Sequence, residues 1–385
     1  MNKHEIVFYP VANGDTSQVI TSNGRRILLD FCHRSCGEDP DDPVIDLNST
    51  LKEELSAVER DDFDVVAFTH ADKDHISGST DFFELQHAEK YQGNGRIKIN
   101  TLWIPAAMLL ENASNDEQSE EFVILRQEAR YRLLEGKDIL VFSHPAKLDE
   151  EWLHEKLKER GLPLNARDHL FVDAGTIVPG FNLIDDKVEF FCHSPFIKHC
   201  DDGDFIRNEA SLVFNVRLDA DGEYFDYLEV GDTGSEGLED IVSITEYHGN
   251  MDRLAWDVFN IPHHCSYKSL NKDEKGDKET TPKPLVEKIL LAGKANAYIV
   301  SSSCPVTDLK ESYEQVQPPH IQARKTYEKY INKVGGRKFL VTMEEPNANK
   351  PKPIRFEIAS SGISLIKAAA TGASFLASVK PPRAG

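Results

Sequence analysis

The sequence contains no long apolar run. No stretch of its 385 residues approaches the ~18 consecutive apolar residues that a membrane-spanning helix needs. The N-terminal segment MNKHEIVFYP has no apolar core after its charges, which argues against a signal peptide. The six cysteines are irregularly spaced, as is typical of a reduced protein. These absences predict a cytoplasmic protein with no membrane association.

Positive charge is also scarce. The chain has 44 Lys and Arg against 65 Asp and Glu, a formal net charge of −21. Such a surface repels phosphate backbones and anionic membranes at long range. Any chemistry on nucleic acid would therefore depend on a local site with bound cations and not on a basic face.

One short stretch concentrates candidate metal ligands. It begins as an apolar run, Val65 to Phe68, which predicts a buried strand. It continues as the pattern H-x-D-x-D-H, whose members are His70, Asp72, Asp74 and His75. A loop that leaves a strand end can direct such side chains to one point, where imidazole nitrogens and carboxylate oxygens bind divalent metals. The alternative is a solvated polar loop.

The segment THADKDHISG resembles the metal loop of the metallo-β-lactamase superfamily, in the variant with Asp72 in place of the middle histidine of H-x-H-x-D-H. This variant is similar to the soluble hydrolase domain of the DNA-uptake protein ComEC and its stand-alone relatives, although ComEC itself is a membrane protein. The resemblance implies an α/β fold, the αββα sandwich, in which two mixed sheets pack face to face with helices outside. It also implies two divalent metal ions, Mn²⁺ or Zn²⁺, as cofactors.

Further segments resemble that branch in the same order along the chain. VANGDTSQVI and LLDF resemble its opening strands, so that Asp15 and Asp30 either lie behind the metal ligands and contact them or are ordinary turn carboxylates. GDTG, after a strand predicted at 224–230, resembles the segment whose aspartate bridges both metals, which implies Asp232. PHHCS resembles the PHHGS segment, with Cys265 where glycine is usual.

The resemblance implies a full set of ligands. One metal would be held by His70, Asp72 and His193, and the other by Asp74, His75 and His264, with Asp232 between them. The segment that supplies His193 is the loosest match, and His199 and Asn208 are alternatives to it. His263 would contact substrate or developing charge, and Asp74 and His263 are the candidate catalytic residues. Cys265 would narrow the site or add a soft ligand.

Residues 1–364 are expected to form a single hydrolase domain, and residues 365–385, rich in Ala, Gly, Ser and Pro, a flexible tail. Residues 105–170 look unlike the compact family core and predict a helical insertion. Its first helix would carry one apolar stripe, formed by Phe122, Leu125, Ala129 and Leu133, and a second helix would span 149–160. This acidic insertion would be a lid over the site, a surface for a protein partner, or added bulk.

A hydroxide that bridges two cations about 3.5–4 Å apart is a nucleophile at neutral pH, and the metals also stabilise the leaving oxygen. The ligand pattern therefore predicts a metallohydrolase. By resemblance it would be a phosphodiesterase or nuclease that acts on nucleic-acid ends, single strands or small nucleotides. The alternatives are hydrolysis of a lactone, ester or thioester at the same metals, and a partner-recruiting module with weak or no catalysis.

Metal preference tests the effect of Asp72. Three of the implied ligands are carboxylates, and oxygen-rich sites suit Mn²⁺ or Mg²⁺ better than histidine-rich sites do. We expect Mn²⁺ to support turnover at least as well as Zn²⁺, and Asp72→His to shift the preference towards Zn²⁺. The measurement is the rate of the metal-free protein after addition of each metal. Wild-type turnover with Zn²⁺ alone would contradict the interpretation.

Overall fold

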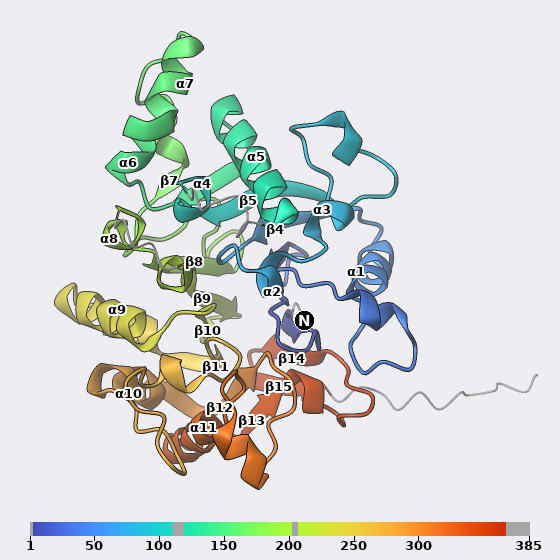
Figure 1. The fold of residues 1–385 in the computed structure, drawn as a ribbon, viewed down its shortest axis with the longest axis vertical. Helices are drawn as coiled ribbons and strands as arrows, with labels where there is room; N and C mark the ends of the chain where they lie inside the picture. Colours follow the sequence, from blue (N-terminus) through green and yellow to red (C-terminus); the bar gives the residue numbers. More distant parts are fainter. Residues whose placement is uncertain (1–2, 111–118, 202–206, 367–385) are drawn as a thin grey trace, which may run out of the picture.

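Two β-sheets form the centre of the fold (Figure 1). The computed structural model describes residues 3–110, 119–201 and 207–366. Within these residues one sheet has nine strands in the order β15-β14-β1-β2-β3-β4-β5-β6-β7, and the other has six in the order β13-β12-β11-β10-β9-β8. The large sheet contains β1 (His4–Phe8), β2 (Ser17–Ile20), β3 (Arg26–Leu29), β4 (Asp62–Ala67), β5 (Lys98–Pro105), β6 (Ile139–Phe142), β7 (Phe171–Val172), β14 (Ile354–Ala359) and β15 (Gly362–Ile366). The small sheet contains β8 (Val188–Ser194), β9 (Val213–Ala220), β10 (Glu223–Glu229), β11 (Trp256–Asn260), β12 (Gly293–Ser301) and β13 (Lys338–Val341).

Both sheets are mixed. β1, β2 and β3 pair antiparallel, whereas β3 to β7 pair parallel. In the small sheet β8, β9 and β10 pair antiparallel, whereas β10 to β13 pair parallel. Parallel strands end at the same edge of a sheet, so the loops after β3 and β4 lie together, as do the loops after β10 and β11.

Helices cover the outer faces of the sheets (Figure 1). The large sheet is covered by α1 (Leu47–Ser56) and α5 (Glu120–Glu135), and the small sheet by α9 (Ser235–Tyr247), α10 (Pro284–Leu291) and α11 (Ile321–Lys333). Shorter helices are α2 (Lys73–Ile76), α3 (Ser79–Phe82), α4 (Ala107–Leu110), α6 (Ala146–Leu148), α7 (His154–Glu159) and α8 (Ile197–Asp201). The predicted αββα sandwich is confirmed.

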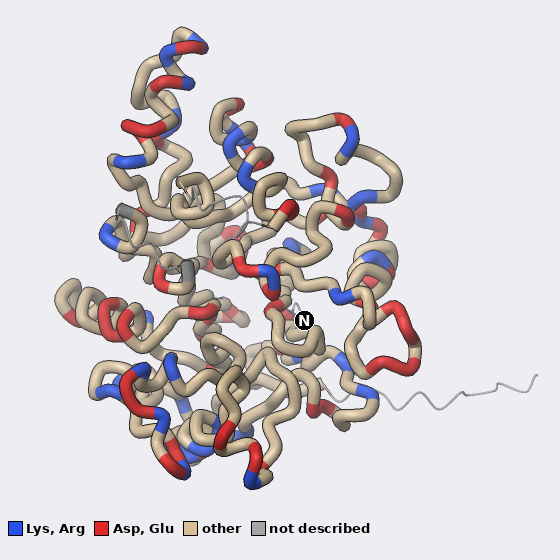
Figure 2. The backbone as a smooth tube through the Cα atoms, in the orientation of Figure 1, with Lys and Arg blue, Asp and Glu red and all other residues tan. Residues whose placement is uncertain are grey.

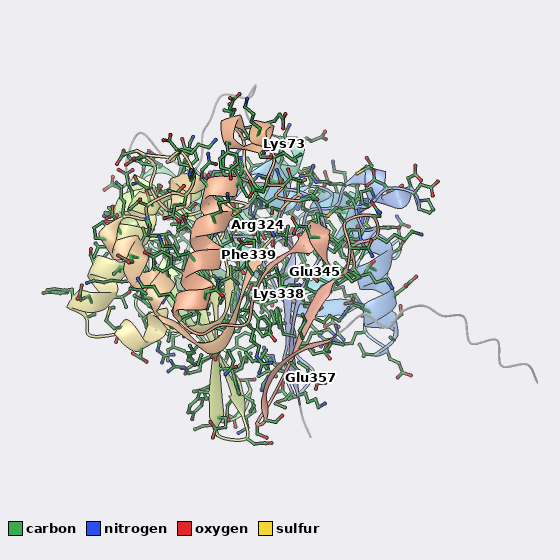
Figure 3. All side chains as sticks on the ribbon, turned by 90° about the horizontal axis from the view of Figure 1, so that it is seen from below. Lys73, Arg324, Lys338, Phe339, Glu345 and Glu357 are labelled. Atoms are coloured by element: carbon green, nitrogen blue, oxygen red, sulfur yellow. The ribbon has the colours of Figure 1, made fainter. Side chains whose placement is uncertain are left out.

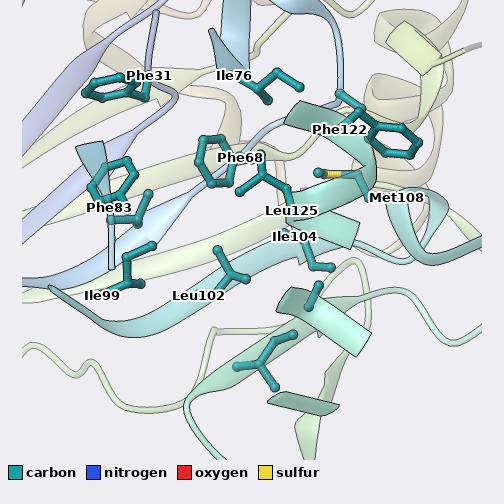
Figure 4. Close-up of a cluster of buried hydrophobic side chains, with 14 of the residues drawn as sticks. Phe31, Phe68, Ile76, Phe83, Ile99, Leu102, Ile104, Met108, Phe122 and Leu125 are labelled. Carbon is teal, nitrogen blue, oxygen red and sulfur yellow. The ribbon is translucent and has the colours of Figure 1, made fainter. Parts of the chain in front are cut away.

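Alternation along the strands builds three apolar layers. In β4, Val65 and Ala67 point into the layer between the sheets, whereas Val66 points to the layer under the helices, as the two-residue period of a strand requires. Figure 4 shows the outer layer of the large sheet, where Phe68 and Leu102 lie near Leu125 of α5. Apolar burial on both faces fixes the register of the central strands.

Residues 105–170 contain both predicted helices and one strand that was not predicted. The stripe of Phe122, Leu125, Ala129 and Leu133 is buried in α5, against the large sheet. The second helix is a π-helical turn, Asp149–Leu153, that continues into α7. β6 lies between them and pairs parallel with β5. Because β6 is only four residues long, its apolar run gives little periodic signal.

No helix in the described ranges is long and apolar enough to cross a bilayer. Most of the predicted tail, residues 367–385, lies outside the part of the chain that the structure describes.

Aromatic rings pack closely in the layer between the sheets. The buried ring of Phe190 lies 5.1 Å, between centroids, from both Trp103 and Phe181. We expect Phe190→Ala to lower the free energy of unfolding by about 3–5 kcal/mol, because it leaves a cavity in a packed core. The control Ile184→Ala, at a side chain that is 82% exposed, should change it by less than about 0.5 kcal/mol. Equal effects in urea unfolding would contradict this assignment of the core.

Candidate metal centre

The metal loop is fixed by its backbone. After β4 the chain passes His70 and Asp72 and enters α2, which contains Asp74 and His75. The α2 segment accepts backbone hydrogen bonds from two neighbouring loops, from Asp15 N to Asp74 O (3.0 Å) and from Phe31 N to His75 O (2.9 Å). The loops after β1 and β3 therefore hold the H-x-D-x-D-H segment in place.

The two sheets meet at this loop through a close backbone approach. Leu212 N, just before β9 of the small sheet, donates to Thr69 O (3.0 Å), and between two loops of the small sheet His263 N donates to Gly231 O (3.2 Å). Gly231 has a φ of 51°, and a Cβ there would lie 3.2 Å from the side chain of Thr69. Glycine at this position lets the loop that carries Asp232 lie against the loop that carries His70.

Asp30 orients His75. The carboxylate of Asp30 accepts hydrogen bonds from Thr69 N and Thr69 Oγ1, both at 2.6 Å. Its Oδ2 also lies 2.7 Å from Nδ1 of His75. With Nδ1 donating to Asp30, Nε2 of His75 faces Asp232, whose Oδ1 is 3.3 Å away. A carboxylate behind a histidine is the usual outer partner of a metal ligand.

His264 is oriented in the same way by a carbonyl. Its Nδ1 donates to Ser302 O (2.8 Å), so Nε2 points to Oδ2 of Asp74 (3.1 Å) and of Asp232 (3.6 Å). His263, His264 and Cys265 all have left-handed backbone conformations, with φ values of 52°, 52° and 66°. Such residues cost roughly 1–2 kcal/mol each and concentrate at functional sites.

Arg324 holds the loop that supplies the Ser302 carbonyl. Its guanidinium lies over the ring of Phe339 (Figure 3), 5.6 Å from the centroid. It also donates to Val306 O (2.6 Å) and to Glu344 (2.8 Å). Loop 302–320, and with it the partner of His264, is therefore anchored to α11 and the small sheet.

These loops assemble a buried set of ligand atoms, which we call the core cluster. Its members are Asp15, His75, Asp232 and His264, whose ligand atoms all lie within 4.8 Å of one another. Within the described part of the chain it is the one such group of three or more His, Cys, Asp or Glu side chains. Ligands about 2.0–2.2 Å from an ion lie at most about 4 Å apart, so a small contraction would enclose a cation.

His70 and Asp72, which we call the outer pair, lie beside the core cluster. Nε2 of His70 is 3.7 Å from Asp72 Oδ2 and 4.0 Å from Asp232 Oδ2. The ring of His70 is buried, whereas the Asp72 side chain is 34% exposed. Asp232 therefore faces the other members of the core cluster on one side and the outer pair on the other, where a bridging carboxylate would lie.

The core cluster and the outer pair fit divalent cations. Nε2 of His70, Nε2 of His75 and Oδ1 of Asp232 are buried but make no hydrogen bond of acceptable geometry. A buried polar atom without a partner is costly, and a cation among these atoms would satisfy all three. The donors are imidazole nitrogens and carboxylate oxygens, which suit Zn²⁺ and Mn²⁺.

The electrostatics of the cluster favour added positive charge. Burial lowers the pKa of His264, but the opposite effect of Asp232 and Asp74 is larger, and the pKa is raised to about 9. Burial also lowers the pKa of His75, and Asp232 and Asp30 raise it well above the ordinary value. Burial raises the pKa of Asp232, yet His264 and His75 hold it well below the usual range. The carboxylates thus draw positive charge to the position that a metal would take.

The structure departs from the sequence prediction at His193. Its Nε2 donates to Arg253 O (3.0 Å), and its Nδ1 lies 3.3 Å from Thr245 Oγ1 of α9. In β8, Val188, Phe190 and Cys192 point into the layer between the sheets, so the two-residue period of a strand places His193 on the opposite face, beside Phe191. That face packs against α9, and His193 does not reach the core cluster.

His199, one alternative to His193, is not brought to the cluster either. Its Nε2 lies 3.1 Å from Oδ2 of Asp240 on α9. Asn208, the other alternative, lies in a short 3₁₀ helix, Arg207–Ala210, where its O accepts from Ser211 N (3.2 Å). No histidine therefore joins the outer pair from the segments 188–201 and 208–216.

Cys265 neither narrows the site nor offers a metal ligand. It is buried in the apolar layer beneath α11, with Sγ 3.9 Å from His320 O, and burial raises the pKa of its thiol. His320 is the residue before α11, and its N donates to Cys265 O (3.0 Å). Both residues support the left-handed turn that presents His264.

Asp15 is a member of the core cluster, whereas the sequence left open whether it belongs to the site at all. Asn260 Nδ2 donates to Asp15 Oδ1 (3.3 Å) and to Glu229 (3.1 Å), beneath the core cluster. Burial and the nearby Asp15 raise the pKa of Glu229 to about 8. The Gly-Asp of VANGD was the available signal for Asp15, whereas Asn260 and Glu229 lie inside apolar strands and gave none.

The comparisons with known proteins are distant. No protein-family model matches the sequence, and no curated protein matches it. Among solved structures the chain is similar to a Parabacteroides distasonis protein assigned as a metal-dependent hydrolase, with 10% identity and a TM-score of 0.33, over 88% of this chain and 93% of that one. It is also similar to a diphosphatase from the PhnP family, with 10% identity and a TM-score of 0.32, over 92% and 98%.

A third match is the metallo-β-lactamase GOB-18 from Elizabethkingia meningoseptica, with 13% identity and a TM-score of 0.31, over 85% of this chain and 92% of that one. At such identities and TM-scores the matches carry no argument about activity. The assignment of a metal centre rests on the geometry of the core cluster and the outer pair.

Asp30→Asn tests whether Asp30 prepares His75 for a metal. The change keeps the shape of the side chain but removes the charge behind the histidine, so we expect affinity for Mn²⁺ or Zn²⁺ to fall about 10–100-fold. The measurement is competition with a chelating indicator. The control Asp61→Asn removes a carboxylate that is 70% exposed and paired with Lys98, and it should leave affinity unchanged. Equal affinities for all three proteins would contradict this role of Asp30.

Proposed function

We propose that the protein is a metal-dependent hydrolase of the metallo-β-lactamase fold that cleaves phosphodiesters. The observation that carries the proposal is the convergence of buried, unpartnered donor atoms of His70, His75 and Asp232 at one edge of the sandwich. Divalent ions bound there would lower the pKa of water and neutralise charge on substrate oxygens.

The chain's own residues supply binding and proton transfer around that centre. Asp74 Oδ2 lies 3.1 Å from His264 Nε2, and the Asp74 side chain is 34% exposed, so it can also accept a hydrogen bond that orients water at the mouth of the site. His263 is 27% exposed, with Nε2 4.0 Å from Asp232 Oδ2. His263 is therefore in position to donate a hydrogen bond to a substrate oxygen.

The donor set favours an anionic substrate. Three carboxylates, Asp72, Asp74 and Asp232, make the centre oxygen-rich, which suits hard cations such as Mn²⁺. Such cations bind the charged non-bridging oxygens of a phosphodiester, whereas a neutral lactone carbonyl offers no such anion. The likeness of the H-x-D-x-D-H loop to the ComEC-like branch supports the same substrate class.

Charge limits the form of that substrate. Figure 2 shows Lys and Arg interspersed with Asp and Glu along the chain in this view, and the net charge is −21. Near the site Lys272 pairs with Glu236, which leaves Lys268 and the exposed Lys73 of α2, too few cations to guide a long duplex. We therefore propose short, single-stranded or end-presented nucleic acid, or a small nucleotide, as substrate.

A panel of substrates tests the proposal. Mn²⁺-loaded protein should hydrolyse single-stranded DNA or RNA, or a generic phosphodiester, faster than duplex DNA and faster than lactones. His263→Ala should lower the rate at least about tenfold without loss of metal, because it removes a contact to developing charge. Asp61→Asn should retain the wild-type rate.

Two results would contradict the proposal. Turnover confined to lactones would assign the centre to carbonyl hydrolysis. Metal binding with no turnover of any substrate would favour a module that recruits a partner, for which the acidic surface of residues 105–170 would be the candidate contact.

A further inference from the structure

The two proposed metal positions differ in the number of side-chain donors around them. The core cluster offers four buried donors, two imidazoles and two carboxylates, within 4.8 Å of one another. Asp74 adds a third carboxylate 3.1 Å from Nε2 of His264. The outer pair offers only His70 and Asp72, together with the shared Asp232.

The donors of the core cluster are held before any ion binds. His75 is fixed by Asp30, and His264 by the Ser302 carbonyl. The amide of Asn260 fixes Asp15 through a hydrogen bond of 3.3 Å. Donors that are already oriented lose little conformational freedom when a cation binds, which raises affinity.

The outer pair offers fewer donors. Nδ1 of His70 lies 3.1 Å from Thr69 Oγ1, and the Asp72 side chain is 34% exposed and lies 3.7 Å from His70 Nε2. His193 lies on the face of β8 that packs against α9 and does not join the pair. Among the described residues, a cation at this position would have three side-chain ligands, one of them shared. Its remaining positions would go to water or to substrate oxygens, as Mn²⁺ and Mg²⁺ allow.

We propose that the protein binds one divalent ion tightly in the core cluster, with Asp15 as a ligand, and a second ion weakly at the outer pair. His193 contributes to neither position. The inference rests on the proposed metal-dependent function but concerns binding alone. The number and charge of the ligands help to set the affinity for hard cations, and both favour the core cluster.

Mn²⁺ binding to the metal-free full-length protein, followed through the electron paramagnetic resonance signal of free Mn²⁺, tests the proposal. We expect two phases whose dissociation constants differ at least about tenfold. Asp72→Asn should weaken the second phase and leave the first within about twofold. Asp15→Asn should weaken the first phase at least about tenfold.

Two variants serve as controls. His193→Ala should change neither phase, and Asp61→Asn should match wild type. Far-UV circular dichroism of each variant separates a loss of ligand from a loss of fold. Two phases of equal affinity, loss of the tight phase in Asp72→Asn, or loss of an ion in His193→Ala would each overturn the proposal.

The outcome is separable from that of the proposed function. A protein that binds two ions in this order but hydrolyses no substrate would uphold the binding inference and contradict the hydrolase. A protein that hydrolyses phosphodiesters but binds two ions equally would support the hydrolase and contradict the binding inference.

Discussion

The centre of this structure depends on a buried carboxylate, Asp232, that faces four histidines. Oδ1 of Asp232 lies 3.3 Å from His75, and Oδ2 lies 3.6 Å from His264 and 4.0 Å from both His70 and His263. These side chains come from the segments that follow three strands, β4, β10 and β11. The sandwich must therefore close with the two sheets in one relative position for the cluster to form, and the left-handed turn at 263–265 is tolerated to complete it.

Much of the fold was predictable because its signals are local. The run from Val65 to Phe68 is apolar on both faces of a central strand, and β4 forms there. The stripe of α5 repeats with a helical period and is buried as a unit. The short strand β6 was missed because four apolar residues carry too little periodicity to separate a strand from a helix.

The site was predictable where its residues are close in sequence. The H-x-D-x-D-H loop leaves one strand end, so spacing alone places His70 and His75 together, and their rings lie 4.0 Å apart. His193 lies on the face of β8 that packs against α9, and which face of a strand meets a helix depends on the whole fold. Asp15 joins the cluster through a hydrogen bond to Asn260, 245 residues away along the chain, and such a contact depends on the whole fold.

Anomalous diffraction from crystals soaked in Mn²⁺ is the most direct test of the account. The account predicts a strong peak within bonding distance of His75 Nε2, His264 Nε2 and Asp232, and a weaker peak beside His70 and Asp72. A core cluster without a peak at saturating Mn²⁺, or a peak at His193, would contradict it.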